Sequence, residues 1–454
     1  MEFVDLLPAF MFLALAILLF TGLPVAIVLG GIGIGFAYFA LSIGEFREAW
    51  IGLVVGRIYG GIVENLVLVA IPMFIYMGTM LEKSGVANDL LHALQVLMRR
   101  VPGGLALSVT LMGTIMAATT GIIGASVVMM TLLALPVMLT RGYNVPLATG
   151  TIAASGTLGI LIPPSIMLVI MGDLLSISVG SLFLAAVFPG LVLALCYMLM
   201  IYITCNLRPS LAPPLPEDMG PSSRRELWGM VFKSFVPPIA LIVLVLGSIF
   251  AGLATPTEAS GIGAAGATLL ALLNRRLNWS VLREVLERSA LTGAMLFFIF
   301  VGATAFSYVF RRLGGDPMIE GFIFAFGLGD WGILFILMAV VFFLGFFFDW
   351  IEITLIVLPV FAPIVAALDF GAHVGTEYVV VWFAILVAVN LQTSFLTPPF
   401  GFALFYMKGV APPSVRIQAI YRGIIPFVLV QLIGMLLVLG FPQIALWLPE
   451  TLLE

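Results

Sequence analysis

The chain has 454 residues, of which 62% are hydrophobic and only 9% are charged, and its mean hydropathy is +1.22. Because soluble domains carry about a quarter of charged residues, this composition excludes a soluble protein. Many apolar runs exceed the roughly 20 residues that cross a bilayer, which predicts an all-α polytopic membrane protein. The two cysteines indicate no disulfide framework and no metal cluster, and the two histidines are far apart in the sequence. The net charge of −4 says nothing about partners, and no nucleic-acid partner is expected.

The first half of the chain is a series of apolar spans with two interruptions. Residues 7–20 and 24–42 predict two spans or one kinked span. Residues 113–140 carry the small, polar apex TTGIIGAS between two apolar arms, which predicts a re-entrant hairpin; the alternative is one long helix whose small residues allow close packing. At 145–172 a hydrophobic helix is broken by SGTLG and a double proline, which cannot continue the backbone hydrogen bonds.

A polar, proline-rich segment at 208–232 is the clear linker. It separates an N-terminal repeat, residues 1–207, from a C-terminal repeat, residues 233–454. The positive-inside rule predicts that the linker and the arginine-rich patch at 275–288 are cytoplasmic.

The second half contains a similar pair of interruptions. Residues 336–364 predict a second hairpin, in which Asp349 and Glu352 lie inside an apolar run. A charge at the bilayer centre costs about 3 kcal/mol, so such a residue usually has a task. The alternative for Asp349 is an ion pair with a distant arginine, and Glu352 is assigned no role because it may equally face the other side. Residues 378–408 predict a second broken helix at NLQTSFLTPP.

Short matches in the same order relate the two halves. LLALPVM at 132–138 resembles LIVLPVF at 355–361, and ILIPPSIMLVIMG at 160–172 resembles FLTPPFGFALFYMKG at 395–409. Paired broken segments at matching positions point to a secondary-transporter site near the midplane. The paired hairpins favour inverted repeats, although the span count does not decide this.

Oxygen donors gather at the interruptions of both halves. Sodium is a hard cation that binds hydroxyl, amide, carboxylate and carbonyl oxygens, so each half offers a candidate site. For each serine or threonine, the alternative is a hydroxyl bonded back to its own helix. The helix N-termini at the hairpins carry partial positive charge, which favours an anionic organic solute as the cargo. The donors are Thr119, Thr120, Ser126, Ser155, Thr157 and Ser165 in the first half, and Asp349, Thr354, Asn390, Gln392, Thr393, Ser394 and Thr397 in the second.

Motifs for other classes of membrane protein are missing from the sequence. No P-loop, HExxH motif or nucleophile elbow occurs, so neither ATP-driven pumping nor hydrolase chemistry is supported. We therefore expect a protein that is not an enzyme. The remaining alternative to a coupled transporter is a passive channel or scaffold subunit without ion coupling.

Four segments closely resemble the large membrane (permease) subunit of tripartite ATP-independent periplasmic (TRAP) transporters: ATPTEAS at 254–260, GYNVPLATGTIAASGTLGILIPPS at 142–165, GFFFDWIEITLIVLPVFAPIV at 345–365 and TPPFGFALFYMKGV at 397–410. The resemblance implies a sodium-driven importer of a small organic acid anion in the bacterial inner membrane. Its partners would be a small four-helix membrane subunit and a periplasmic substrate-binding protein. It also implies an elevator mechanism, in which a transport domain with two hairpins slides against a scaffold.

The resemblance further implies the site residues. The first sodium site corresponds to Gly124, Ser126, Ser155, Gly156, Thr157 and Gly159, and the second to Asp349, Thr354, Asn390, Thr393 and Thr397. Substrate contacts are expected at Thr120, Ser126, Pro164, Ser165 and Pro398. The first apex departs from the family pattern, because it has GIIGASVV where many members have a serine-rich run, so its site has fewer hydroxyls.

Overall fold

The structure is a computed structural model that describes residues 3–121, 123–215, 223–325, 327–398 and 401–453. These residues form helices joined by turns. Eight of the described helices are long and apolar enough to cross a membrane, and several shorter apolar helices accompany them. The chain is therefore a multi-pass membrane protein, as the composition predicts.

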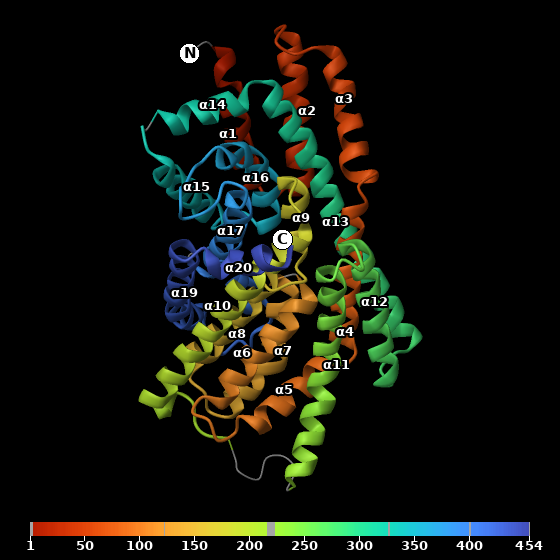
Figure 1. Ribbon diagram of the computed structural model, residues 1–454, viewed down its shortest axis with the longest axis vertical. Coiled ribbons are helices and arrows are strands. Elements are labelled where there is room, and N and C mark those ends of the chain that lie inside the picture. Colours follow the sequence, from red (N-terminus) through yellow and green to blue (C-terminus); the bar gives the residue numbers. More distant parts are fainter. Residues whose placement is uncertain (1–2, 122, 216–222, 326, 399–400, 454) are drawn as a thin grey trace.

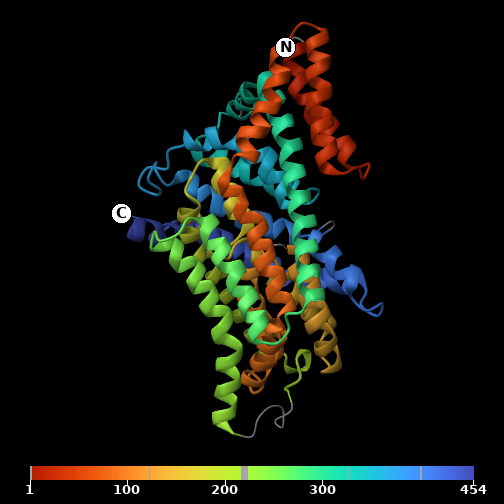
Figure 2. The same cartoon turned by 90° about the vertical axis from the view of Figure 1, so that its right-hand side faces the viewer.

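One set of helices, here called the framework, runs along the long axis of the molecule (Figures 1 and 2). α13 packs along α2 and α4, and α12 packs along α4 and α11. Within this set the chain forms two separate helices where one kinked span was the alternative, with a turn at Gly22, whose φ is +79°. The framework comprises α1 (Leu7–Leu19), α2 (Val25–Ser42), α3 (Glu48–Ile58), α4 (Ala70–Lys83), α11 (Arg224–Phe250), α12 (Pro256–Leu273) and α13 (Trp279–Arg312).

A second set, here called the core, contains two helical hairpins and two broken helices. α17 is the most buried of the candidate spans in the described part of the chain, with 94% of its residues buried. A helix that is hydrophobic all round belongs in an interior, so this burial follows from its sequence. The hairpins are α6 (Gly104–Thr120) with α7 (Ile123–Thr140), and α15 (Asp330–Leu344) with α16 (Trp350–Ala366); the broken helices are α8 (Val145–Thr157), η4 (Leu158–Ile160) and α9 (Ile166–Leu175), and α17 (Val379–Leu396) with α18 (Phe402–Val410).

The remaining helices enclose the core. A short helix precedes each hairpin and a long helix follows each broken helix, so the elements have the same order in both halves. These flanking helices are α5 (Val86–Leu97), α10 (Val179–Leu207), α14 (Gly315–Phe324), α19 (Ile417–Gly440) and the C-terminal α20 (Gln443–Leu453).

The two halves exchange partners in a reciprocal way. α7 of the first hairpin packs on α18, and α16 of the second hairpin packs on α9. In the same manner, α8 packs against α19 and α17 packs against α10. Each half therefore completes the surroundings of the other half's broken helix.

The boundaries of several elements differ from those predicted. The first hairpin begins at Gly104 rather than near residue 113, because Gly103, whose φ is +71°, starts the helix there. The second begins at Asp330 rather than near residue 336. α11 begins at Arg224, inside the predicted linker 208–232, where the Ser223 hydroxyl accepts a hydrogen bond from the Arg225 N–H.

The linker and the arginine-rich patch lie at the same end of the molecule. α11 follows the linker, and the short turn after it returns the chain as α12, which packs on α11. The patch that begins at Arg275 directly follows α12 (Figure 1). The positive-inside rule predicts that this end faces the cytoplasm.

Glycines permit the closest helix contacts, which is the usual way for helices to associate in a membrane. A Cβ added to Gly423 in α19 would overlap the carbonyl oxygen of Pro146 in α8, and one added to Gly150 would overlap the carbonyl of Gly423. In the framework, a Cβ on Gly302 of α13 would overlap the carbonyl of Ala26 in α2.

Gly423→Ala is expected to destabilise the protein, because the new methyl group meets backbone rather than a movable side chain, and overpacking costs about 1–3 kcal/mol. Gly440→Ala is the matched control at the end of the same helix, where an added Cβ meets nothing within 4 Å. The measurement is the midpoint of thermal aggregation in detergent. Equal midpoints for the two variants would contradict the proposed close contact.

Candidate functional site

Three helix N-termini meet at one small cavity between the core and the framework. The cavity has a volume of about 80 Å³. Gly124 lies at the start of α7, Trp350 at the start of α16 and Phe402 at the start of α18, and all three line it. α13 forms the opposite wall through Thr292, Met295 and Leu296.

A larger opening of about 290 Å³ continues from this cavity. The two spaces share Gly124, Thr292, Met295 and Tyr406, so they form one groove. The larger part is lined by α4 as well, and it contains Glu82 and Arg288, which form an ion pair at 3.2 Å. A small solute in the groove would therefore touch both the hairpin tips and the framework.

Asp349 is the acidic residue that lines the inner cavity. It is the N-cap of α16, and its carboxylate accepts a hydrogen bond of 2.7 Å from the Trp350 N–H. Glu352 completes a capping box by accepting a hydrogen bond of 2.9 Å from the Asp349 N–H. Among the described residues Asp349 has no ion-pair partner, so the alternative of a distant arginine is not realised.

Glu352 faces away from the groove. It lines an apolar cavity that Phe12 and Leu15 of α1 close from the framework side. The two acids of this hairpin therefore have different surroundings, and only Asp349 meets the space where a solute would lie.

The helices that carry the residues predicted for the first sodium site pack together, although a Cβ added to Gly124 would meet Tyr406 of α18. A Cβ added to Gly156 would lie 2.5 Å from Cγ2 of Val127, so the first turn of α7 contacts the end of α8 directly. Gly113 of α6 approaches Ser155 from the other arm of the hairpin. Ser126, Ser155 and Thr157 are all buried there, and Gly159 follows in η4.

The hydroxyls at this break are bonded within their own segment, as the alternative interpretation predicts. The Ser155 hydroxyl donates to the Thr151 carbonyl at 2.6 Å, and Thr157 donates to Ala154 at 2.9 Å. The Ser165 hydroxyl, next to the buried Pro164, donates to Ile160 at 2.6 Å. Each oxygen keeps acceptor capacity after donating its proton, so these bonds leave room for a cation. The side chains of Thr119 and Thr120 lie outside the described part of the structure.

The residues predicted for the second sodium site are only partly together. Asn390 donates to the Met338 carbonyl at 2.7 Å, which ties α17 to the first arm of the hairpin. The hydroxyls of Thr354, Thr393 and Thr397 donate to carbonyls one turn earlier in their own helices. No described contact joins Asp349 to the α17 donors, because its side chain lines the groove instead. Pro398 lies half-buried in the turn after α17.

A polar contact connects the two broken helices at the centre of the core. The Gln392 amide donates to the Thr157 hydroxyl at 3.4 Å. The Gln392 carbonyl oxygen and the Thr151 hydroxyl are buried and have no hydrogen-bond partner among the described residues. Buried oxygens without partners are costly, and they mark a place where a water or a cation would be stabilised.

Several groove residues were not predicted from the sequence. Tyr406 contacts the first hairpin tip, since a Cβ on Gly124 would lie 3.1 Å from its ring, and it lines the cavity with Asp349. Thr292 and Met295 come from α13, far away in the chain. A tyrosine within the apolar half-helix FALFYMKG was the one available signal. No group of three or more histidine, cysteine or acidic residues among the described residues suits a metal cluster.

A solved structure and several curated proteins resemble this chain. A crystal structure of the YdaH transporter of Alcanivorax borkumensis has a TM-score of 0.57 and 14% sequence identity, and the match covers 85% of this chain and 86% of that one. The two chains therefore share a fold.

Curated relatives match along most of the chain. The C4-dicarboxylate TRAP transporter large permease protein DctM of Pseudomonas aeruginosa is 32% identical over 86% of this chain and 87% of its own length. The ectoine/5-hydroxyectoine large permease UehC of Ruegeria pomeroyi is 30% identical, with 97% and 98% covered. The sialic acid large permease SiaM of Vibrio cholerae is 28% identical, with 96% and 97% covered.

The model of the family described as "Tripartite ATP-independent periplasmic transporter, DctM component" matches residues 12–444. The chain, with its paired hairpins and broken helices, thus belongs to the DctM family of TRAP transporter large permeases.

Proposed function

We propose that this permease imports a small organic acid anion across the inner membrane, driven by sodium. The cargoes in the names of the relatives, C4-dicarboxylates, sialic acid and ectoine, are small organic acids, which supports this class. The family supports two partners, a periplasmic binding protein that delivers the substrate and a small four-helix membrane subunit.

The observation that carries the proposal is the meeting of Asp349 with the N-termini of α7 and α18 in one cavity of about 80 Å³. Helix N-termini attract an anion, whereas a carboxylate at the same place repels it. Like charges 4 Å apart repel by about 4 kcal/mol at an effective dielectric constant near 20. An anion would therefore bind better when a cation lies close enough to offset the charge of Asp349.

This mutual dependence is what a symporter needs. If a cation strengthens anion binding by some factor, the anion strengthens cation binding by the same factor. Each sodium ion that crosses 100 mV contributes about 2.3 kcal/mol, which supports accumulation of the anion.

We place the sodium ions at the two helix breaks. The contact of α7 with Gly156 and the unpartnered oxygens of Gln392 and Thr151 support an ion near the first break. The tie between Asn390 and Met338 supports a second ion near the other break. The freed backbone carbonyls at each break supply further donors, which offsets the few hydroxyls at the first apex.

We further propose an elevator movement of the core against the framework. The reciprocal packing of the two halves supports inverted repeats, and the glycine contacts of α13 with α2 support a rigid framework. The groove lies at the boundary between the two sets of helices, so movement along α13 would carry its contents across the membrane.

Asp349→Asn is expected to lower sodium-dependent uptake by roughly tenfold or more, which corresponds to a loss of about 1.4 kcal/mol. The fold should be retained, because asparagine caps a helix about as well as aspartate. The measurement is uptake into proteoliposomes that contain the permease with its small subunit and binding protein, with and without a sodium gradient at constant pH. If the unmodified protein takes up the anion equally fast with and without a sodium gradient, the result would instead support a passive channel.

The matched control is Asp330→Asn, the same chemical change at the start of the other arm of this hairpin, outside the groove. Its uptake should equal that of the unmodified protein. If both variants lose uptake equally, the position of Asp349 in the groove is not the cause.

Gly124→Ala is expected to slow uptake several-fold, because the new methyl group lies 3.1 Å from the Tyr406 ring and narrows the groove. In a Tyr406→Ala background the same change should have little further effect, since the neighbouring ring is gone. Initial uptake rates of the two single variants and the double variant test this coupling. Additive losses would show that the two residues do not act through one space.

A further inference from the structure

A second, larger cavity of about 520 Å³ lies farther along α13, towards its C-terminal end. Its volume is within the range of small-molecule sites. Its walls come from both sets of helices, including Arg57 of α3, Asp173 of α9, Tyr308, Arg311 and Arg312 of α13, and Leu355 of α16.

The lining of this cavity carries three arginines and one acid. The acid, Asp173, accepts a hydrogen bond of 2.6 Å from the side chain of Asn65. Arg311 donates to the Pro359 carbonyl and lies 3.6 Å from Asp316. Arg57 and Arg312 form no ion pair among the described residues. The cavity is therefore positively charged and has guanidinium groups without a carboxylate partner.

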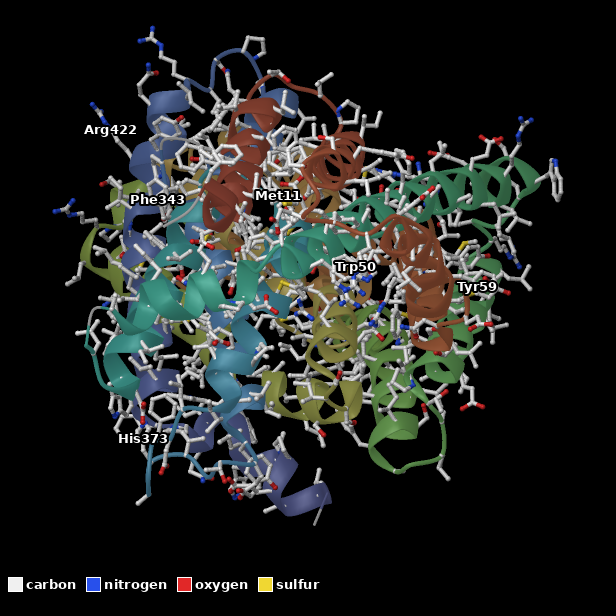
Figure 3. All side chains as sticks on the ribbon, turned by 90° about the horizontal axis from the view of Figure 1, so that it is seen from above. Met11, Trp50, Tyr59, Phe343, His373 and Arg422 are labelled. Carbon is white, nitrogen blue, oxygen red and sulfur yellow. The ribbon has the colours of Figure 1, made fainter. Side chains whose placement is uncertain are left out.

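The position of Arg312 is fixed by aromatic rings. Its guanidinium lies 5.0 Å from the centre of the Trp50 ring and 5.5 Å from that of Tyr308. Figure 3, which views the molecule from this end, shows Trp50 beside α13. Such stacking holds the planar group in place while its N–H donors stay available.

Neutral donors complete the lining. The Tyr308 side chain is 8% exposed, and its hydroxyl is buried without a hydrogen-bond partner among the described residues. Thr304 and Ser307 add hydroxyls on the same face of α13. A planar guanidinium with nearby hydroxyl donors is the usual partner of a carboxylate.

The cavity follows the groove along the same two helices. On α13, Thr292 and Met295 line the groove, while Thr304 and Ser307 line the cavity. Thr292 and Ser307 are 15 residues, about four turns, apart and lie close to one face of α13. Met295 and Thr304 are nine residues, about two and a half turns, apart and lie on opposite sides, so the lining shifts around the helix between the groove and the cavity. On α16, Asp349 lines the groove and Leu355 lines the cavity.

We propose that this cavity, here called the arginine vestibule, is a second anion site, which captures the carboxylate of the cargo before it reaches the hairpin tips. It lies towards the C-terminal end of α13, away from the linker and the arginine-rich patch. Because the positive-inside rule assigns the linker and the patch to the cytoplasm, this end would be the one from which an importer takes its substrate. That the cargo is an organic anion rests on the proposed function. The vestibule differs from the groove in charge, because the groove pairs its arginine with Glu82.

The test measures local charge with thiol reagents. Ser307→Cys is placed in the full chain after Cys196→Ser and Cys205→Ala remove the native thiols. We compare the rates at which a sulfonate-bearing and a trimethylammonium-bearing methanethiosulfonate modify the new thiol. The anionic reagent should react faster relative to the cationic one, and Arg57→Gln with Arg312→Gln should lower this ratio on the order of tenfold.

Thr292→Cys is the matched control in the groove on the same helix face. Its ratio should not change with the two arginine substitutions, and an unchanged absolute rate would show that the variant is folded. If the ratio at position 307 also stays unchanged, the vestibule is not an electrostatic site and the proposal is wrong.

Protection of the thiol by a bound carboxylate distinguishes binding in the vestibule from simple attraction of a charged reagent. Succinate and pyruvate, used as probes without sodium, should slow modification at position 307 in the parent and not in the arginine variant. If the anionic reagent reacts faster but neither succinate nor pyruvate slows its reaction, the vestibule does not bind a carboxylate and the proposed capture site is wrong. Protection in a protein whose uptake does not need sodium would leave the vestibule in place while the proposed coupling fails.

Discussion

Backbone groups that leave a helix inside a membrane must find partners within the protein, and the core is built around this constraint. Both broken helices are covered by the other half of the chain, since α9 packs under α16 and α18 under α7. A side chain satisfies part of the freed backbone at the first break, where Ser165 donates to the Ile160 carbonyl. The reciprocal arrangement therefore covers both breaks, which is where the proposed ion sites lie.

The same constraint explains where charge is tolerated. Asp349 lies half-buried because it caps α16 and meets a cavity rather than lipid. Its position among helix N-termini gives the groove opposing electrostatic preferences, which the proposed cation would resolve. The arginine vestibule has the reverse balance, because Asp173 is the one acid in its lining and Arg57 and Arg312 form no ion pair among the described residues. The proposed capture site would thus precede, along α13, a groove in which anion binding depends on a cation.

The framework helices are held tightly to one another beside the groove and the vestibule. α13 contacts α2 at Gly302 so closely that no side chain fits between them, and Lys83 of α4 forms an ion pair with Glu284 of α13. Contacts to backbone do not adapt, whereas Met295 of α13 and Tyr406 of α18 line open space in the groove. The proposed movement of the core against the framework would take place at this boundary.

The amino-acid sequence determined the membrane class, the paired interruptions and the importance of Asp349, because hydropathy and helix-breaking residues act locally. It also identified the donors near Ser155 and Asn390. Only the tertiary structure decided that Asp349 lines a groove with Tyr406 and Thr292, since those residues come from distant parts of the chain. It likewise decided that the three arginines of the vestibule share one cavity. Packing between helices sets such neighbours, and no local pattern in the chain encodes which faces will meet.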